Sequence, residues 1–260
     1  MSIAVVGIWR YPVKSLQGEA LEEGIVERDG LQGDRRWGIR EGRTGRILTA
    51  RRRPELLHAA ASYREGQPVI TLPDGRVGEG PGPRTDQLLS QWLGSPVSLV
   101  SSLDAAPGRA EYFEDATDDT SQAIEWTMPE SRYVDAAALL VLTTASLRTA
   151  GALHPAGSWQ PRRFRPNLLL DTPGQEWPED RWIGHRLHAG TATLAPTEGC
   201  IRCTMVTRDQ PGIDADRDVF RVLARHHDAR FGVWCDVATS GAVALGDEVE
   251  VHIDDHELTN

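Results

Sequence analysis

The part of the sequence best suited to chemistry holds two cysteines three positions apart, Cys200 and Cys203. This spacing fits half of a zinc site, a redox dithiol, a single soft ligand for a redox metal, or two buried small residues. A zinc site would take two more ligands, which only Cys235 with His226 or His227 could supply. A redox dithiol would open a helix in a βαβ unit, which the β-rich surroundings do not predict. The spacing alone therefore leaves all four interpretations open, with zinc and the dithiol disfavoured.

Two basic residues add to this chemistry. Arg202 lies directly before Cys203, and a neighbouring positive charge lowers the pKa of a thiol. The resulting thiolate would suit a transition metal. Lys14 is the only lysine among 28 basic side chains, so its position either requires an ammonium group or keeps a lysine by chance. Three cysteines cannot form a disulfide framework and leave at least one free thiol, which indicates a reducing compartment.

Composition and missing motifs exclude several functional classes. The 260 residues carry a formal charge of −10, which argues against binding along a nucleic-acid backbone. The N-terminus does not resemble a secretory signal, and no apolar stretch reaches the roughly 18–20 residues of a membrane span. The sequence has no G-x-S-x-G, Walker A or H-E-x-x-H motif. We therefore expect a soluble, cytoplasmic protein with neither a nucleic-acid nor a membrane partner.

The elements that position these residues are expected to form a mainly β fold with some α (α+β). Short apolar runs separated by Gly, Pro and Asp-Gly turns predict a small barrel or sandwich over residues 1–100. One helix is expected within it, at 84–93. Apolar runs resume at residue 136 and are interrupted by a helix at about 215–229, so residues 101–260 are expected to form a second β-rich domain. The acidic stretch over 103–135 lacks periodicity, and we expect a surface loop or lid there.

Seven short segments, in order along most of the chain, carry a resemblance to a known family. They are Tyr11-Pro-Val-Lys-Ser15, Gly33-Asp-Arg-Arg-Trp37, Leu48-Thr-Ala-Arg51, Leu142-Thr-Thr-Ala-Ser-Leu147, Phe164-Arg-Pro-Asn167, Cys200-Ile-Arg-Cys203 with Thr207 and Asp209, and Leu245-Gly-Asp-Glu-Val249. The sequence resembles a MOSC-domain protein with the associated N-terminal β-barrel domain. Within that family it is similar to the mitochondrial amidoxime-reducing component and its bacterial relatives.

The resemblance implies a fold, a cofactor and a set of site residues. It implies an N-terminal small β-barrel followed by a MOSC β-barrel with peripheral helices. The molybdenum cofactor, Mo-molybdopterin, would be bound with Cys203 as the metal ligand. The residues that the resemblance assigns to the pterin and its phosphate are Lys14, Ser15, Arg35, Arg165, Asn167 and Arg202. Thr143 and Thr144 match a segment that lines the cofactor, with a role at the end of a core strand as the alternative. Asp209 is a candidate catalytic residue that carries protons, although we favour a role in a turn.

The resemblance further implies an oxidoreductase that takes oxygen from a small N-hydroxylated substrate. An iron–sulfur centre usually takes four cysteines, so we expect electrons from a separate ferredoxin, flavoprotein or cytochrome. Relatives carry a small polar residue where this chain has Ile201, which puts one hydrogen bond to the cofactor in doubt. Two alternatives stay open: a sulfur carrier or transferase with a persulfide on Cys203, and a cofactor carrier without turnover.

Overall fold

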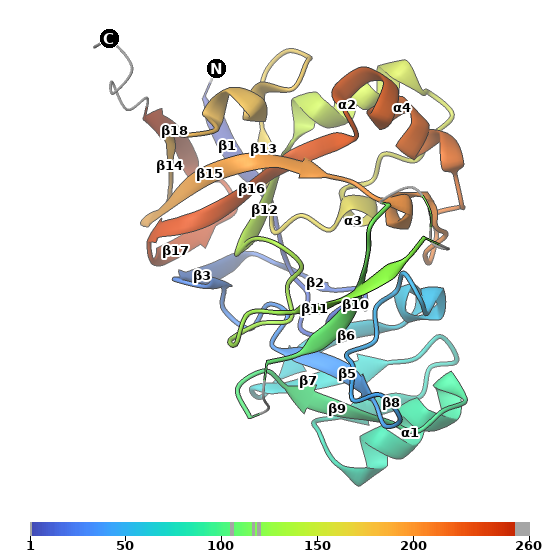
Figure 1. The fold of residues 1–260 in the computed structure, drawn as a ribbon. Helices are drawn as coiled ribbons and strands as arrows, with labels where there is room; N and C mark the ends of the chain where they lie inside the picture. The colour runs from blue at the N-terminus through green and yellow to red at the C-terminus, as the bar shows by residue number, and fades with distance from the viewer. Residues whose placement is uncertain (1, 105–106, 116–117, 119–120, 253–260) are drawn as a thin grey trace.

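The structure is a computed structural model that describes residues 2–104, 107–115, 118 and 121–252. Positions 105–106, 116–117 and 119–120 of the expected 103–135 loop, and the last eight residues of the chain, lie outside this description. The described residues form two β-rich units stacked one on the other (Figure 1). Strands predominate and helices are few, so the mainly β fold with some α is confirmed.

Seven strands of one unit close a barrel in the described part of the chain. Neighbouring strands in the barrel follow the order β13 (Leu168–Asp171), β12 (Leu139–Thr143), β16 (Arg230–Thr239), β15 (Ala192–Ile201), β14 (Arg186–Ala189), β18 (Glu248–His252) and β1 (Ile3–Arg10). The barrel closes because β1 also pairs with β13. A short strand, β2 (Glu19–Leu21), extends the sheet beyond β1.

The composition of the central strands explains their place in the barrel. β12 and β13 are the parallel pair, and both are near-continuous apolar runs, as strands buried on two faces require. Their inward side chains, such as Val141 and Leu168, belong to the barrel core. Their outward side chains, such as Leu142 and Leu169, pack in a second cluster that includes residues of α4 (Arg217–His227) and α2 (Thr144–Leu153). The helix predicted at about 215–229 is thereby confirmed as α4.

The first strand of the chain lies in the barrel built by the C-terminal half. β1 pairs with β13 on one side and with β18 on the other. A second crossing links β3 (Glu23–Glu27) to β17 (Gly241–Ala244), and β4 (Gly30–Leu31) pairs with β3. The chain therefore leaves the barrel at Arg10 and enters the other unit near Val13, which bridges to Trp37. This route places residues 11–15 between the two hydrophobic cores.

The other unit holds a separate apolar core. Its strands are β5 (Trp37–Glu41) with β9 (Val97–Ser101), and β6 (Ala60–Arg64) with β7 (Gln67–Thr71) and β8 (Val77–Glu79). The helix expected at 84–93 is confirmed as α1 (Pro83–Leu93), which ends at Gly94 with a left-handed φ of 66°. A 3-10 turn, η1 (Pro54–His58), buries Leu56 and Leu57 in the same core.

The acidic segment that we expected to be a loop contains a β-hairpin instead. β10 (Arg109–Phe113) and β11 (Ala123–Thr127) pair antiparallel over their full lengths. Its acidic side chains are not simply solvated: Glu111 pairs with Arg46 at 2.9 Å and with Arg52 at 2.5 Å. Only Ala110 and Phe113 of β10 are buried, so the apolar alternation is too sparse to reveal the strand in the sequence.

Candidate functional site

Lys14 is a buried cation between the two units. Its side chain is 5% exposed, and its Nζ donates to Oδ1 of Asp135 at 2.6 Å and to the backbone oxygen of Tyr133 at 3.1 Å. The next residue, Ser15, has a left-handed φ of 70°, and its Oγ accepts from the Ala50 backbone at 3.0 Å. An ammonium group has three donors, so Lys14 keeps one for a further acceptor.

Arg35 and Arg165 meet at the same place from distant parts of the chain. Arg35 forms an ion pair with the fully buried Asp34, and its Nη1 lies 3.4 Å from Oδ1 of Asn167. Arg165 follows α3 (Pro161–Phe164), and its Nη1 donates to the Leu16 oxygen at 2.6 Å. Both arginines have left-handed backbones, with φ of 50° and 58°. This conformation costs a non-glycine residue about 1 kcal/mol, and such strain gathers at functional sites.

These groups together carry an excess of positive charge. Burial and the neighbouring Arg35 lower the pKa of Arg165 to about 10, which leaves it charged at neutral pH. The Asp135 side chain is 71% exposed, yet the surrounding protein partly desolvates its carboxyl; Lys14, Arg35 and Arg165 outweigh this desolvation and lower the pKa of that carboxyl. The described cations of the site thus outnumber their carboxylates, Asp34 and Asp135, although the chain as a whole is acidic.

The two cysteines follow β15 on the same side of the barrel. Cys200 is buried and Cys203 is partly exposed. Arg202 donates from Nη1 to Sγ of Cys200 at 2.9 Å and from Nη2 to the Phe164 oxygen at 2.7 Å. Arg202 acts on both thiols as the sequence predicts, but its charge does not set the direction of their pKa shifts. Burial outweighs Arg202 and raises the pKa of both thiols, because desolvation penalises the charged form.

The electrostatic neighbours of Cys203 connect it to the cationic site and to the hairpin. Arg202, Arg51 and Asp135 all act on the pKa of Cys203. Arg51 lies over the Phe113 ring at 4.2 Å and donates to backbone oxygens at the end of the hairpin. The hairpin is therefore joined to the surroundings of Cys203. Sequence reasoning assigned no role to Arg51 or Asp135, although Arg51 lies in one of the matching segments.

Asn167 is held by the protein on both sides of its amide. Its Oδ1 accepts from the Leu140 backbone at 3.2 Å, and its Nδ2 donates to the Trp9 oxygen at 3.2 Å. These bonds join the beginnings of β12 and β13 to the end of β1. Asn167 thereby holds these three strands together beside Arg35 and Arg165. Its assignment to the pterin stays a prediction.

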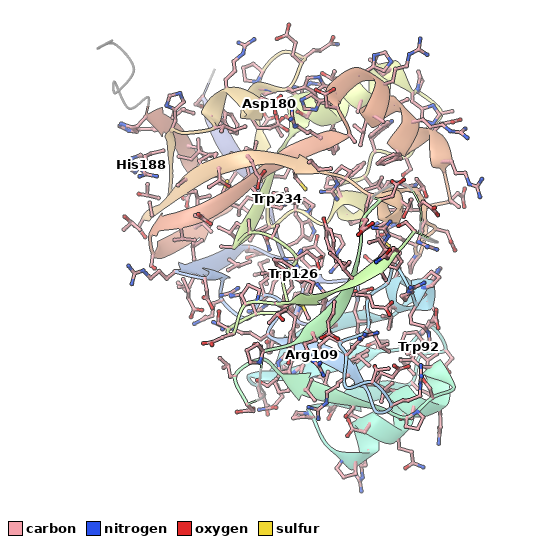
Figure 2. All side chains as sticks on the ribbon, viewed as in Figure 1. Trp92, Arg109, Trp126, Asp180, His188 and Trp234 are labelled. Atoms are coloured by element: carbon pink, nitrogen blue, oxygen red, sulfur yellow. The ribbon has the colours of Figure 1, made fainter. Side chains whose placement is uncertain are left out.

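Thr143 and Thr144 lie at the opposite end of the β12–β13 pair from Asn167. Thr143 caps α2 by accepting from the Ser146 backbone at 3.1 Å, and its Oγ1 donates to the buried Glu179 at 2.7 Å. Thr144 donates to Asp171 at 2.6 Å. Figure 2 shows Asp180, the neighbour of Glu179, beside α2 at the far end of the barrel. The structure does not bring these threonines to the cationic site, which favours the strand-end alternative.

Asp209 lies beyond the 3-10 turn that follows Cys203, η3 (Thr204–Thr207). Its side chain is 63% exposed, and Oδ2 lies 3.2 Å from Nε2 of His58. This contact joins the cysteine loop to η1 of the other unit. The contact is consistent with the structural role that we favoured, and a proton-carrying role stays a prediction.

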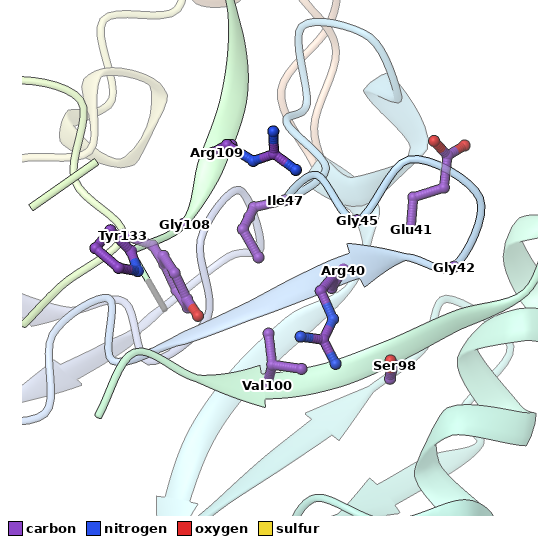
Figure 3. A pocket seen from close by; sticks show the side chains of 11 residues that line it. Arg40, Glu41, Gly42, Gly45, Ile47, Ser98, Val100, Gly108, Arg109 and Tyr133 are labelled. Atoms are coloured by element: carbon purple, nitrogen blue, oxygen red, sulfur yellow. The ribbon is translucent and has the colours of Figure 1, made fainter. Parts of the chain in front are cut away.

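One cavity among the described residues is separate from this site. It measures about 490 Å³ and lies beside β5, β9 and the start of β10, where Arg40 and Arg109 line it (Figure 3). The Tyr133 ring forms part of its wall, whereas the Tyr133 backbone oxygen binds Lys14. No predicted cofactor residue lines this cavity.

Two further findings concern metals and membranes. Across the described ranges, no group of three or more His, Cys, Asp or Glu side chains could hold a metal ion, as the zinc interpretation would require. No helix among the described residues has the length and apolar character needed to cross a bilayer.

The structure is thus a two-unit β protein in which a cluster of cations from distant segments lies near a partly exposed thiol. The model of the MOSC N-terminal beta barrel domain matches residues 2–94, and that of the MOSC domain matches residues 129–250. The chain therefore belongs to the MOSC-domain family. MOSC-domain proteins are associated with the molybdenum cofactor.

A curated relative and two solved structures are similar to this chain. A molybdenum cofactor sulfurase from Oryza sativa subsp. japonica is 26% identical over 238 residues, covering 77% of this chain and 28% of that protein. The YUAD protein from Bacillus subtilis is 14% identical, with 98% of both chains covered and a TM-score of 0.49. YiiM from Geobacillus stearothermophilus is 13% identical, with 45% of this chain and 55% of that chain covered and a TM-score of 0.35.

Proposed function

We propose that this chain binds the molybdenum cofactor with Cys203 as metal ligand and acts as an oxidoreductase on N-hydroxylated compounds. One observation supports this above all. Lys14, Arg35 and Arg165, which are far apart in sequence, converge on Asp135, and Asp135 also acts on the pKa of Cys203. A phosphate needs such cations, and a redox metal needs such a thiol.

The donor set fits the phosphate end of the cofactor. Only Nη1 of Arg165 has a hydrogen-bond partner among the described residues, so its other nitrogens can donate to a ligand. Lys14 adds a point charge, and Asp34 holds the Arg35 guanidinium in place. These groups would bind and orient the phosphate. The buried ring of Tyr11 lies beneath the two arginines and excludes water from that side of them.

The donor set also fits the metal end. Cys203 is partly exposed, whereas the other two thiols are buried. A bound metal deprotonates a coordinating thiol, so the raised pKa of Cys203 does not prevent ligation. When bound, the cofactor supplies oxygen-atom and two-electron chemistry. Arg202 would hold Cys200 aside through its hydrogen bond and leave Cys203 as the ligand.

Turnover would need two further components. We propose a small N-hydroxylated substrate and a separate electron-transfer protein of ferredoxin, flavoprotein or cytochrome type. Arg51 contacts Phe113 of the β10–β11 hairpin and also acts on the pKa of Cys203. We therefore propose that the hairpin contacts the substrate.

Reduction of benzamidoxime by the purified protein, with a reduced viologen dye as electron source, tests this function. We expect benzamidine to form with wild-type protein from a host that makes the cofactor, and not with Cys203→Ala. The control Cys235→Ala removes a thiol buried inside the barrel and should remain active. Equal activity of the Cys203 variant would remove this thiol from the mechanism.

A second candidate function is sulfur transfer through a persulfide on Cys203. The similarity to a molybdenum cofactor sulfurase and the partly exposed thiol favour it. Sulfur transfer does not require the cations around Arg165, so we rank it second. Incubation with cysteine and a cysteine desulfurase tests this second function. Mass spectrometry should then show an added mass of about 32 Da on Cys203, which is one sulfur atom, only if the second function is correct.

A further inference from the structure

Tyr11 lies beneath the two arginines of the candidate site and is fixed at two of its own atoms. Its side chain is 1% exposed. Its backbone nitrogen donates to Oδ1 of Asp34 at 2.7 Å, and its hydroxyl donates to the Pro166 oxygen at 3.1 Å. The ring therefore has little freedom to move, and its hydroxyl is already occupied.

Both guanidinium groups lie over this one ring. The central carbon of Arg35 is 4.8 Å from the ring centroid, and that of Arg165 is 4.3 Å away. These two like charges repel each other: burial is the main cause of the lowered pKa of Arg165, and the charge of Arg35 lowers it further. An aromatic face attracts each guanidinium within about 6 Å of its centre, so the ring offsets part of this repulsion.

Tyr11 also holds the backbone that carries Arg165. Pro166, whose oxygen accepts the Tyr11 hydroxyl, directly follows Arg165 in the sequence. Arg165 has the strained φ of 58°, and a strained residue persists only where its surroundings fix it. One side chain thus contacts the guanidinium of Arg165 and fixes the peptide that follows it.

We propose that Tyr11 is the positioning residue of the anion site, whose ring sets the places of the Arg35 and Arg165 guanidiniums and whose hydroxyl fixes the Arg165 backbone. The inference rests on the proposed function, because the anion is the cofactor phosphate. The phenol itself does not bind the ligand, because its hydroxyl already donates to the Pro166 oxygen. Burial raises the pKa of Tyr11 to about 12, so the phenol stays a neutral donor at physiological pH.

Tyr63 provides a matched control outside the site. Arg10 lies over the Tyr63 ring at 4.6 Å, and the Tyr63 hydroxyl donates to the Gly33 oxygen at 3.1 Å. The two tyrosines therefore make the same kinds of contact. Tyr63 is less buried than Tyr11, so Tyr63→Leu should cost the fold less stability, and it should leave the anion site intact.

Two measurements on Tyr11→Leu, Tyr11→Phe and Tyr63→Leu test the proposal. The first is molybdenum per chain after purification from a cofactor-making host. The second is the dissociation constant for inorganic pyrophosphate of cofactor-free protein, by calorimetry. We expect Tyr11→Leu to weaken pyrophosphate binding by about tenfold and to lose molybdenum. Tyr11→Phe keeps the ring but loses the hydrogen bond to the Pro166 oxygen, so it should weaken pyrophosphate binding by only about threefold.

The outcomes separate this inference from the proposed function. Tyr11→Leu protein that binds pyrophosphate as wild type does would overturn the positioning role. If Tyr11→Leu does not fold, a Tyr11→Phe variant as weak as Arg165→Ala would overturn the role of the ring. The proposed function alone would be overturned if wild-type protein binds pyrophosphate, Tyr11→Leu weakens that binding, and wild type never holds molybdenum. Wild-type protein that binds neither would overturn both.

Discussion

Arg202 donates a hydrogen bond to Sγ of Cys200 at 2.9 Å, although its neighbour in the sequence is Cys203. The arginine thus holds the buried thiol, while Cys203 receives a backbone hydrogen bond from Met205 and stays partly exposed. This division of contacts gives two cysteines so close in sequence different surroundings. Cys203 is partly exposed, and Cys200 is buried.

Alkylation of native, metal-free protein should therefore modify Cys203 first. Burial raises the pKa of this thiol above its ordinary value of 9.0, so the rate with iodoacetamide should still be rising at pH 9, by about tenfold per pH unit. Peptide mass spectrometry at short times identifies the modified residue. Faster labelling of Cys200 or Cys235 would contradict the observed burial.

Substitution of Asp135 should strengthen anion binding. The Asp135 carboxylate accepts from Nζ of Lys14 at 2.6 Å and competes with any other anion for that ammonium group. Because this carboxylate is largely exposed, Asp135→Asn should tighten pyrophosphate binding only by about two- to fivefold. Lys14→Ala should weaken it, and the charge-matched control Asp74→Asn, on a distant turn, should change nothing. Weaker binding by Asp135→Asn would show that the carboxylate supports the site.

A buried arginine fixes the segment that carries Tyr133 and Asp135. Arg132 is 1% exposed and donates to Asp29 at 2.9 Å and to Glu27 at 3.2 Å. Arg132→Met should reduce the free energy of unfolding by about 2–4 kcal/mol, because it leaves buried backbone oxygens without this donor and the two acids with Arg36 alone. Arg36→Met removes a more exposed arginine from the same acids and should cost less. Urea unfolding of both variants measures the difference, and equal losses would contradict this role of Arg132.

The free energy of unfolding should fall as pH rises, because His227 loses its proton. Burial opposes its charge, but the contact of Nε2 with Asp180 at 2.6 Å outweighs it and raises the pKa. Stability from the protonated histidine is fully present below its ordinary pKa of 6.5 and is lost as pH rises through the higher folded value. Over that pH window, the melting temperature of wild type should fall more than that of Asp180→Asn. Parallel pH profiles would exclude the ion pair as the cause.

The sequence predicted well those features that depend on local pattern. The mainly β fold, α1 and α4 follow from apolar periodicity, and membership of the MOSC-domain family follows from short matching segments. Lys14, Arg35, Arg165 and Cys203 do lie in one neighbourhood. Their convergence depends on β1 entering the barrel of the C-terminal strands, a long-range pairing that no local pattern reveals.

The sequence was less informative where a contact depends on tertiary structure. The hairpin over 103–135 escaped detection because ion pairs with distant arginines, rather than an apolar alternation, hold it. Thr143 and Thr144 stand in a matching segment, yet their hydroxyls bind Glu179 and Asp171. The roles of Tyr11 and Asp34 become visible only when the guanidinium groups beside them are located.

Metal content is the measurement that tests cofactor binding through Cys203 most directly. Wild type and Cys203→Ala should be purified in parallel from a host able to make the cofactor and analysed by mass spectrometry. We predict nearly one molybdenum per wild-type chain and a background value in the variant, with similar unfolding midpoints for the two proteins. Molybdenum that persists in Cys203→Ala, or zinc or no metal in wild type, would contradict this account.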